Sequence, residues 1–568
     1  MLTEVTQYSL GVLPKPCYIL YLDAKSAFDK VLLQILIRNL YFCGTSGKEL
    51  LCINHRLQNR RTIAEWDRTL MGPIRDEIGV EQGGVNSGEL YKIYSKPQLQ
   101  MAQDSNLGVP LAPGIVISAL GQADDTVLVS NDLHSLQNLL QLTLLYCSKN
   151  NVELCPGKTV LQVMSTKDMA AEIRYLKQFS PVSINDIKIQ FHDNTEHVGI
   201  VRSVHGNLPN ILQRISAHKK AMGAVLSNGL ARHHRSNPAA RLKVEQVYGT
   251  PVLLSGLASL QLKNSELAQI SKHHRTTILN LLHLPPSTPQ PVLYFLAGSL
   301  PCEALIHLRQ LTLLGMISRQ NGSYLYRHCL NVFTSKSGTG SWFRKLRDIC
   351  LMYQLPHPLE ILSSPLSKHT YQKQMKKKVL NYWELKLRQD SSNLSSLKHF
   401  KPQFMSLSKP HPLLITAGAS PYEVCKANIQ VLFLSGRYRT EQLCRHWSKN
   451  PSGFCLSPSC EGMGTIEDVH HIFLQCDSLS HVRQRLVAFT LTYSQQVPLL
   501  SDLLLSLTNP CSNLFLQFMM DCSVIPQVIT LVQAYGQEVL HHLFKVSRTW
   551  CYFLHRERLR ILGRWFKQ

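Results

Sequence analysis

The sequence predicts an α+β protein, with strands concentrated in the first 206 residues and helices after them. Residues 17–23, CYILYLD, form a short apolar run that ends in an acid, which is the pattern of a buried strand. Residues 112–120 and 126–130 place β-branched side chains on either side of two adjacent aspartates, which predicts a strand, a tight turn and a second strand. From about residue 207 onward, helices are expected to predominate.

Three helices are expected within the strand-rich part. Residues 31–44 carry apolar side chains at helical spacing and stop at a glycine, as a helix does. Residues 72–95 are glycine-rich in the middle, and a helix is expected from Ser87. Residues 133–151 have the spacing of an amphipathic helix.

The end of the strand-rich part and the breaks in the helical part can also be located. Residues 187–193, IKIQFHD, and residues 196–203, EHVGIVRS, are expected to pair as a further hairpin. Proline-rich breaks mark candidate boundaries at residues 284–291, 354–360 and 408–414.

Composition narrows the partner and the compartment. The 568 residues contain 60 Lys plus Arg against 37 Asp plus Glu, a formal charge of +23, which favours a polyanionic partner such as nucleic acid over a merely soluble basic protein. The 16 cysteines are too sparse for a disulfide scaffold, the start MLTEVTQYSL is no signal peptide, and residues 250–262 are too short and broken to span a bilayer. We therefore expect an intracellular protein of the nucleus or cytoplasm that is not secreted and has no membrane partner.

The adjacent carboxylates Asp124 and Asp125 raise the question of their use. Their apolar flanks predict at least partial burial, and a buried unpaired charge is costly. One use is to bind a divalent cation together with a third carboxylate, for which Asp23 at the end of the first strand is the candidate. The alternative is that the two aspartates only shape a hairpin turn.

Four segments in order carry a family resemblance, namely LDAKSAFD (22–29), GVEQGGVNSGELYKIYS (79–95), GQADDTVLVS (121–130) and ELCPGKTVLQ (153–162). This set resembles the palm motifs A to D of reverse transcriptases, and most of all those of LINE-type, non-LTR retrotransposons. Gln122 departs from the pattern, because the family has an aromatic residue there.

The resemblance implies a two-metal polymerase that copies an RNA template onto a DNA primer from deoxynucleoside triphosphates. Asp23 and Asp124 would hold two Mg²⁺ ions, with Asp125 as a more peripheral member of the catalytic group. Lys158 would lie near the pyrophosphate and donate a proton. Phe28 would exclude a 2′-hydroxyl, although a core aromatic is the alternative interpretation.

The resemblance also implies contacts with the nucleotide, the template and the primer. Gln82 and Gly83 would lie against the incoming nucleotide and the template, where a glycine permits close approach. Residues 197–199 stand where the family grips the primer end, and only Gly199 matches that pattern.

A cysteine and histidine pattern lies in the C-terminal third. Cys455, Cys460, His471 and Cys476 supply three thiolates and one imidazole, the donor set of a closed tetrahedral Zn²⁺ site. Buried reduced cysteines are the alternative. LINE-type proteins commonly carry a Cys-Cys-His-Cys knuckle after the polymerase, which favours zinc; His470 is a rival ligand.

The resemblance implies a right-hand polymerase palm, an antiparallel sheet with helices, followed by a mostly α-helical thumb and a C-terminal region with a small zinc knuckle. The expected parts are the palm with motifs A to E (1–206), a thumb-like region (207–285), a helical connection (286–440), the knuckle-like segment (441–480) and a C-terminal helical region (481–568). Residues 370–389 and 548–567 mix basic and aromatic side chains, which suits phosphate contact with base stacking and suits a docking helix equally well.

The position of the motifs leaves two functional hypotheses. Only 22 residues precede Asp23, whereas the family places its fingers and often an endonuclease upstream, so an N-terminally truncated protein is expected. The first hypothesis is an RNA-directed DNA polymerase that acts with a separate upstream portion and has weak or no activity alone. The alternative is a non-catalytic nucleic-acid-binding remnant, and a Mg²⁺-dependent nuclease is a remoter third.

Overall fold

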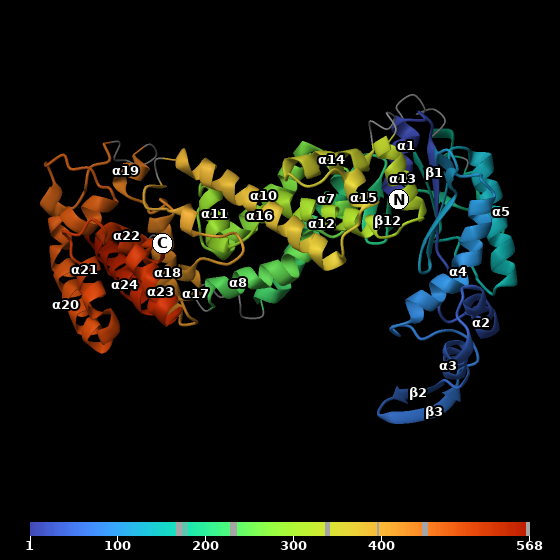
Figure 1. Ribbon diagram of the computed structural model, residues 1–568, viewed down its shortest axis with the longest axis horizontal. Coiled ribbons are helices and arrows are strands. Elements are labelled where there is room, and N and C mark those ends of the chain that lie inside the picture. The colour runs from blue at the N-terminus through green and yellow to red at the C-terminus, as the bar shows by residue number, and fades with distance from the viewer. Residues whose placement is uncertain are drawn as a thin grey trace. The chain divides into compact units, whose positions relative to one another are not determined.

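The computed structural model describes residues 1–165, 174–176, 178, 180–227, 236–334, 341–394, 397–445 and 452–563 (Figure 1). The chain forms two compact units whose segments interleave in sequence. The first unit comprises residues 1–213, 255–266 and 309–372, and the second comprises residues 214–254, 267–308 and 373–568. The α+β prediction is confirmed, whereas the predicted domain boundaries stay predictions.

A five-stranded sheet forms the centre of the first unit among the residues described. Its order is β11 (Gln190–Phe191), β8 (Val160–Met164), β1 (Cys17–Leu22), β7 (Asp125–Ser130) and β6 (Ala119–Gln122). β1 pairs antiparallel with both β7 and β8, but β11 pairs parallel with β8. The expectation of an antiparallel sheet is therefore wrong at one edge, and the sheet is mixed.

The hairpin expected between residues 187–193 and 196–203 is also wrong. Residues 196–203 turn back on themselves, because Val198 and Gly199 both have positive φ and join β12 (Asn194–His197) to β13 (Ile200–Ser203). Residues 187–193 instead supply β11 and β10 (Ile187–Lys188), and β10 pairs with β9 (Ser183–Ile184). Two tight turns thus replace one wide hairpin.

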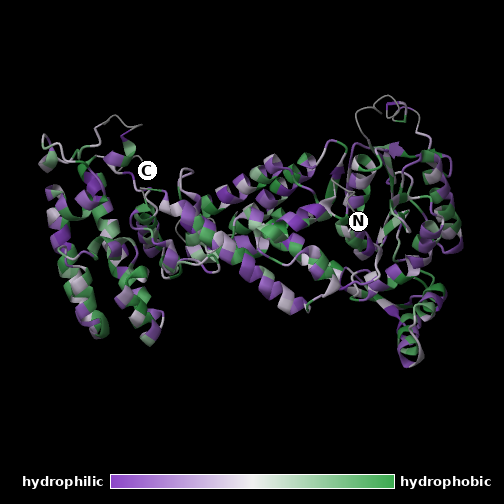
Figure 2. Ribbon diagram, turned by 45° about the horizontal axis from the view of Figure 1, so that its top comes forward, coloured by the Kyte–Doolittle hydropathy of each residue, from purple (hydrophilic) through white to green (hydrophobic). Residues whose placement is uncertain are grey.

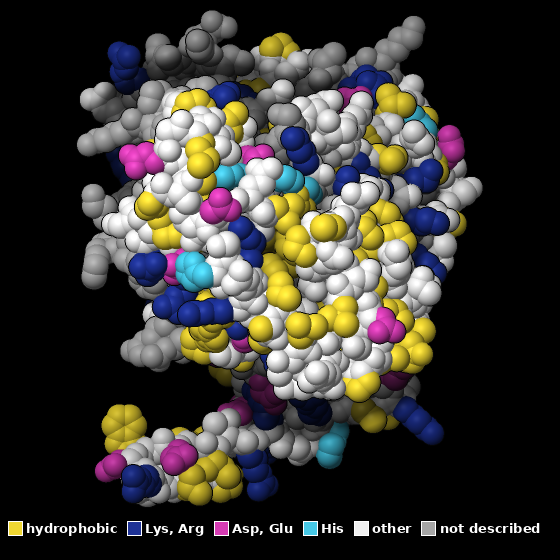
Figure 3. Space-filling model, turned by 90° about the vertical axis from the view of Figure 1, so that its left-hand side faces the viewer, with side chains coloured by type: hydrophobic (Ala, Val, Ile, Leu, Met, Phe, Trp, Pro, Cys, Tyr) yellow, Lys and Arg dark blue, Asp and Glu magenta, His cyan; other side chains and the backbone are white. Residues whose placement is uncertain are grey.

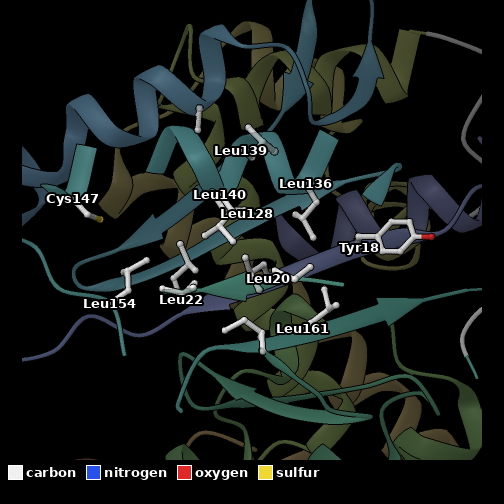
Figure 4. Packing of buried hydrophobic residues seen from close by; sticks show 14 of the residues in the cluster. Tyr18, Leu20, Leu22, Leu128, Leu136, Leu139, Leu140, Cys147, Leu154 and Leu161 are labelled. Carbon is white, nitrogen blue, oxygen red and sulfur yellow. The ribbon is translucent and has the colours of Figure 1, made fainter. Parts of the chain in front are cut away.

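Both faces of the sheet are covered, which explains why every residue of β1 is buried. On one face Leu136 of α5 (Leu133–Lys149) packs with Leu20 and Leu128 of the sheet, as Figure 4 shows. Asp132 begins α5, because its carboxylate accepts a hydrogen bond from Ser135 N at 2.7 Å. The opposite face, with Ile19 and Val127, packs against α1 (Leu2–Gly11) and the hairpin of β4 (Val109–Ala112) and β5 (Ile115–Ile117).

A smaller core lies beside the sheet. The predicted helices begin close to the expected positions, as α2 (Leu33–Phe42) and α4 (Ser87–Asp104), and they bury Leu36, Leu40 and Tyr94 between them. Between them in sequence come α3 (Gly47–Gln58) and an exposed two-stranded hairpin of β2 (Arg61–Trp66) and β3 (Thr69–Arg75). The first unit also contains α13 (Tyr324–Thr334), α14 (Trp342–Met352) and α15 (Pro358–Ser363).

Within the part that the structure describes, the second unit is mainly helical and has no β-strand beyond an isolated bridge between Phe454 and Ile466. Many of its helices carry hydrophobic and hydrophilic residues on different sides (Figure 2). Its helices include α8 (Pro238–Val244), α11 (Gln290–Ala297), α18 (Pro421–Leu434), α20 (Ser480–Gln496), α21 (Ser501–Leu507), α22 (Phe515–Met520), α23 (Pro526–Tyr535) and α24 (Glu538–Ile561). α7 (Leu208–Val225), α10 (Asn264–Leu281), α12 (Cys302–Ser318) and α16 (Lys368–Ser392) each contribute residues to both units.

In each of the two basic and aromatic segments, the tryptophan that the structure describes belongs to the core; residues 564–567 of the second segment lie outside the described residues. Trp550 of α24 is fully buried, and its ring N–H donates to Thr490 Oγ1 at 3.1 Å. Trp383 of α16 is buried as well. Neither of these two rings is therefore available for base stacking, because both are packed inside the helical core.

Among the helices described, none is by itself long and apolar enough to cross a membrane, and one bent pair, α11 with α12, meets that test by length and composition only.

Candidate active site

A cleft of about 520 Å³ opens at one edge of the first unit's sheet. Four segments that are far apart in sequence line it. Its described lining includes Asp23, Phe28, Gln82, Gly83, Asp124 and Lys158. These are six of the seven residues for which the sequence predicts a polymerase role; the seventh, Asp125, does not line the cleft.

Strand pairing brings Asp23 and Asp124 to the same end of the sheet's strands. β1 ends at Leu22, directly opposite Thr126 of β7, so Asp23 follows β1 just where the β6–β7 turn closes. Gln122 pairs with Asp125 across that turn, and Ala123 occupies its first central position with a φ of +55°. Asp124 is thereby held at the tip of the turn, beside the end of β1.

The partial burial that the apolar flanks predict is confirmed for Asp124 but is wrong for Asp125. Asp23 and Asp124 are half-buried, whereas Asp125 is exposed, because β6 is an edge strand and ends in solvent. Desolvation raises the pKa of the Asp125 carboxyl above its usual range, and the negative charges of Asp124 and Asp23 raise it further. The edge therefore carries clustered negative charge.

The segment that contains Lys158 is tied to the end of β1. Its backbone docks there, since Cys155 N donates to Asp23 O at 2.8 Å and Lys25 N donates to Glu153 O at 2.8 Å. Lys158 Nζ then lies 3.8 Å from Asp23 Oδ2. This cation is the partial counter-charge of the carboxylate cluster.

The glycine-rich segment packs against the residues that follow Asp23. Val80 N donates to Phe28 O at 2.8 Å. Gly79 has a φ of +84°, and a Cβ there would lie 2.8 Å from Asp29 O, so no other residue fits without a shift. The contact directs Gln82 toward Asp29, where its Nε2 lies 3.3 Å from both carboxylate oxygens.

Phe28 lies between the cleft and the core. Its ring is half-buried, with its centroid 5.0 Å from that of the buried Tyr91 of α4. Packing on Tyr91 fixes the ring from behind, while the other side lines the cleft. The two sequence interpretations, a core aromatic and a cleft residue, therefore describe two sides of the same ring.

Several cleft residues carry no sequence signal of their own. Lys25, Ser26 and Cys155 line the cleft. Glu153 bonds to Lys25 Nζ at 3.3 Å and also to Lys30 Nζ, and these two bonds lower the pKa of its carboxyl group. Except for Lys30, these residues lie inside the first and the fourth motif segment, but their contacts could not be predicted, because they depend on the docking of one loop on the other.

The predicted cysteine and histidine cluster also forms, in the second unit. The candidate ligand atoms of Cys455, Cys460, His471 and Cys476 all lie within 4.8 Å of one another, and all four residues are buried. Cys460 Sγ lies 3.5 Å from His471 Nε2. The rival ligand His470 is exposed and lies outside this cluster.

A buried carboxylate borders the cysteine cluster. Glu467 Oε2 lies 3.7 Å from Cys455 Sγ, while Oε1 accepts a bond from Glu441 N at 3.0 Å. Arg558 of α24 also donates to Oε1, from both Nε at 3.1 Å and Nη2. The segment around the cysteines is thus tied to α24 by a buried ion pair.

Comparison with known proteins agrees with the resemblance of the motifs. The chain matches none of the curated proteins with which it was compared. Residues 4–178 match the model of the family described as reverse transcriptase (RNA-dependent DNA polymerase), and this span contains every residue that lines the cleft. The first unit thus carries a domain similar to reverse transcriptases, and by this resemblance the enzyme class of the chain is RNA-directed DNA polymerase.

Proposed function

We propose that the protein is the reverse transcriptase of a non-LTR, LINE-type retrotransposon, which extends a DNA primer on an RNA template by two-metal nucleotidyl transfer. One observation carries the proposal: Asp23, Asp124 and Lys158 come from three distant segments and line one open cleft together with Phe28 and Gln82. A turn-shaping role for the aspartates would not require a third carboxylate and a lysine beside them.

The donor set fits divalent cations. Mg²⁺ prefers carboxylate oxygens and keeps several positions for water and phosphate, which suits half-exposed aspartates at the mouth of a cleft. Desolvation and then the negative charges of Asp124 and Asp23 raise the pKa of Asp125, and a bound cation would relieve the repulsion between these charges. Asp23 and Asp124 would hold two Mg²⁺ ions, which, when bound, make the primer 3′-hydroxyl a better nucleophile and offset the charge of the triphosphate.

The chain's own groups bind, select and move a proton. Gln82 and Gly83 lie against the nucleotide and the template, and Phe28 blocks the position of a 2′-hydroxyl. Lys158 Nζ, beside Asp23, donates its proton to the departing pyrophosphate. Because Lys158 is exposed, it can leave Asp23 when that carboxylate takes another partner.

The second proposed metal is structural. Three thiolates and one imidazole form a closed tetrahedral set for Zn²⁺ with no position left for a substrate. We propose that Zn²⁺ at Cys455, Cys460, His471 and Cys476 cross-links the segment that connects α19 (Glu441–Cys444) to α20.

Primer extension tests the polymerase. The full chain receives a poly(rA)/oligo(dT) duplex, Mg²⁺ and dTTP, beside an Asp124→Ala variant and a matched Asp104→Ala variant, whose exposed aspartate at the end of α4 lies outside the cleft. We expect weak extension by the native chain and by Asp104→Ala, and a loss of at least about a hundredfold for Asp124→Ala. No extension by the native chain, with RNA binding retained, would instead leave a non-catalytic nucleic-acid-binding remnant.

A further inference from the structure

A second cleft, of about 620 Å³, lies wholly within the second unit, between α18, α20 and α24. We name it the C-terminal cleft. Among the described residues that line it, five are cationic, and a single carboxylate, Glu557, opposes them. The cations are Lys426 of α18, Arg485 of α20, and Lys545, Arg556 and Arg560 of α24.

Two of these cations have no acidic partner within the described chain. Lys426 bonds to Glu423 at 2.8 Å and Arg560 bonds to Glu557 at 2.6 Å, so these charges are largely balanced. By contrast, neither Arg485 nor Lys545 has a described carboxylate within 4.0 Å. Lys545 Nζ lies over the ring of Tyr493, 5.0 Å from its centroid, which orients the ammonium but leaves its charge uncompensated.

Aromatic rings alternate with the cations along the walls. Phe553 of α24 lines the cleft and is 36% exposed, a large fraction for a phenyl ring in the middle of a packed helix. Phe489 of α20 also lines it and stacks on Tyr493 with the ring centroids 5.9 Å apart. The core helix α24 therefore presents the ring of Phe553 and the cation of Lys545 to the cleft, although Trp550 of the same helix is buried.

The walls of the cleft are fixed before any ligand arrives. Arg548, one residue from the cleft residue Thr549, is buried. It forms an ion pair with Glu423, with 3.0 Å between Nε and Oε2, and its Nη1 donates to Thr416 O at 2.8 Å. Trp550 anchors α24 to α20 through Thr490. A rigid site loses little conformational entropy on binding, which favours affinity for a flexible ligand.

We propose that the C-terminal cleft binds a single-stranded nucleic acid, with Arg485 and Lys545 on its phosphates and Phe553 stacked against a base. Uncompensated cations bordered by exposed aromatic rings match a backbone that carries both charge and π-faces. An acidic protein segment would use the cations but not the ring, and the net charge of +23 favours a polyanion as long as a nucleic acid. This site is separate from the polymerase cleft and does not depend on catalysis there.

The first experiment tests the proposed contact between the cleft cations and the phosphates. Fluorescence anisotropy measures binding of a labelled single-stranded oligoribonucleotide to the full chain across a salt series. Arg485→Ala/Lys545→Ala removes two cleft charges, and Lys243→Ala/Lys272→Ala removes two exposed charges elsewhere in the same unit. We expect the first pair to weaken binding about tenfold or more at low salt and to make the slope of log K against log salt shallower by about 1.4. The control pair should change the slope by much less; equal effects of the two pairs would overturn the proposal.

Substitution of Phe553 tests the stacking part. Phe553→Leu keeps apolar bulk without a ring, and Phe553→Tyr keeps the ring. We expect the leucine variant to bind single-stranded RNA or DNA at least about fivefold more weakly, and the tyrosine variant to bind like the native chain. Equal binding by the two variants, or equal affinity for double-stranded RNA, would contradict stacking against a base.

Cross-linking with thiouridine-substituted RNA locates the site directly. We expect adducts on residues 481–489 and 545–560, and poly-glutamate at equal charge concentration should not displace the RNA. Adducts confined to the first unit, or displacement by poly-glutamate, would overturn the proposal. The same measurement on the Asp124→Ala chain separates the two proposals, because extension reports the polymerase and the adducts report the C-terminal cleft.

Discussion

The carboxylates at the end of β1 and in the β6–β7 turn repel one another when no cation is bound. In the folded state desolvation and then this repulsion raise the pKa of Asp125, so its ionised form is disfavoured there. The protonated form of Asp125 therefore contributes to the free energy of unfolding. This contribution is fully present below the unfolded pKa of about 3.9 and is lost as pH rises through the raised pKa of the folded state. We predict that Asp125→Asn leaves stability unchanged below that window and increases it at neutral pH by less than about 1 kcal/mol, because water screens an exposed carboxylate.

Urea unfolding at several pH values, without divalent cations, measures this difference. Addition of Mg²⁺ should then raise the free energy of unfolding of the native chain more than that of the Asp124→Asn variant. A ligand that binds only the folded state stabilises that state, and the variant lacks one of the proposed ligands. A native chain more stable than Asp125→Asn at neutral pH without Mg²⁺ would contradict the repulsion argument.

Two glycines of the segment at residues 79–83 have the same backbone conformation but different surroundings, so each serves as the control for the other. Gly79 and Gly83 have φ values of +84° and +85°, but a Cβ on Gly79 would meet Asp29 O at 2.8 Å, whereas nothing lies within 4 Å of one on Gly83. We predict that Gly83→Ala costs about 1 kcal/mol for the left-handed conformation alone and that Gly79→Ala costs about 1–3 kcal/mol more. Equal costs in urea unfolding would show that the Asp29 backbone moves freely.

The ring of Phe28 should control sugar selection. It is fixed from behind by Tyr91 and lines the cleft, so its loss opens space without removing a charge. We predict that Phe28→Val raises the use of rUTP relative to dTTP on poly(rA) by about tenfold to a hundredfold. Phe42→Val, the same substitution at an exposed ring outside the cleft, is the control. Unchanged selection in both variants would assign Phe28 to the core alone.

The cysteine cluster and α24 depend on each other through one buried carboxylate. Glu467 is 2% exposed, contacts Cys455 Sγ and pairs with Arg558, so its removal leaves a buried guanidinium without this partner. We predict that Glu467→Ala costs about 3–5 kcal/mol, against less than about 0.5 kcal/mol for the exposed Glu461→Ala.

Zinc content, measured by atomic absorption after exhaustive dialysis, extends this test. Cys476→Ser should lose the metal, and a chelator should lower the melting temperature of the native chain but not that of Cys476→Ser. A native chain free of zinc, with an unchanged melting temperature under chelation, would assign the four side chains to reduced packing.

Elements determined by local sequence could be predicted, and those determined by distant pairing could not. The buried strand β1, the β6–β7 turn and the start of α4 at Ser87 follow from residues that are adjacent in the chain. The parallel pairing of β11 on β8 depends on where two separate segments meet. The hairpin of β2 and β3 is exposed along its whole length, so no buried face leaves an alternating pattern.

The same distinction holds for the candidate site. Asp23, Asp124 and Lys158 lie in short motifs, so the sequence identifies them before the sheet is known. The places of Cys155 and Glu153 depend on a loop docked on the end of β1. Trp550 lies in a segment whose composition suits base stacking and a docking helix equally well, and only the packing of α24 shows that this ring is buried.

At the scale of the whole molecule, the first unit includes segments that come late in the chain, among them residues 309–372. The carboxylate of Glu4, in α1 against the sheet, is buried and accepts bonds from Trp342 N at 2.6 Å and Ser341 Oγ at 2.8 Å. His328 Nε2 lies 3.2 Å from the same group. The helix that covers one face of the polymerase sheet therefore depends on residues more than 300 positions away.

This dependence predicts that residues 1–213 alone do not reproduce the first unit, although they contain every residue of the polymerase cleft. In the shortened chain the Glu4 carboxylate loses its three partners, and α1 should loosen from the sheet. We expect faster amide hydrogen exchange in α1 and β1 than in the full chain, and loss of primer extension with all three aspartates present. Glu4→Gln in the full chain should cost about 1–3 kcal/mol, whereas the exposed Glu49→Gln should cost almost nothing. Equal protection of α1 in the short and full chains would show that the sheet and its cleft need nothing from residues 309–372.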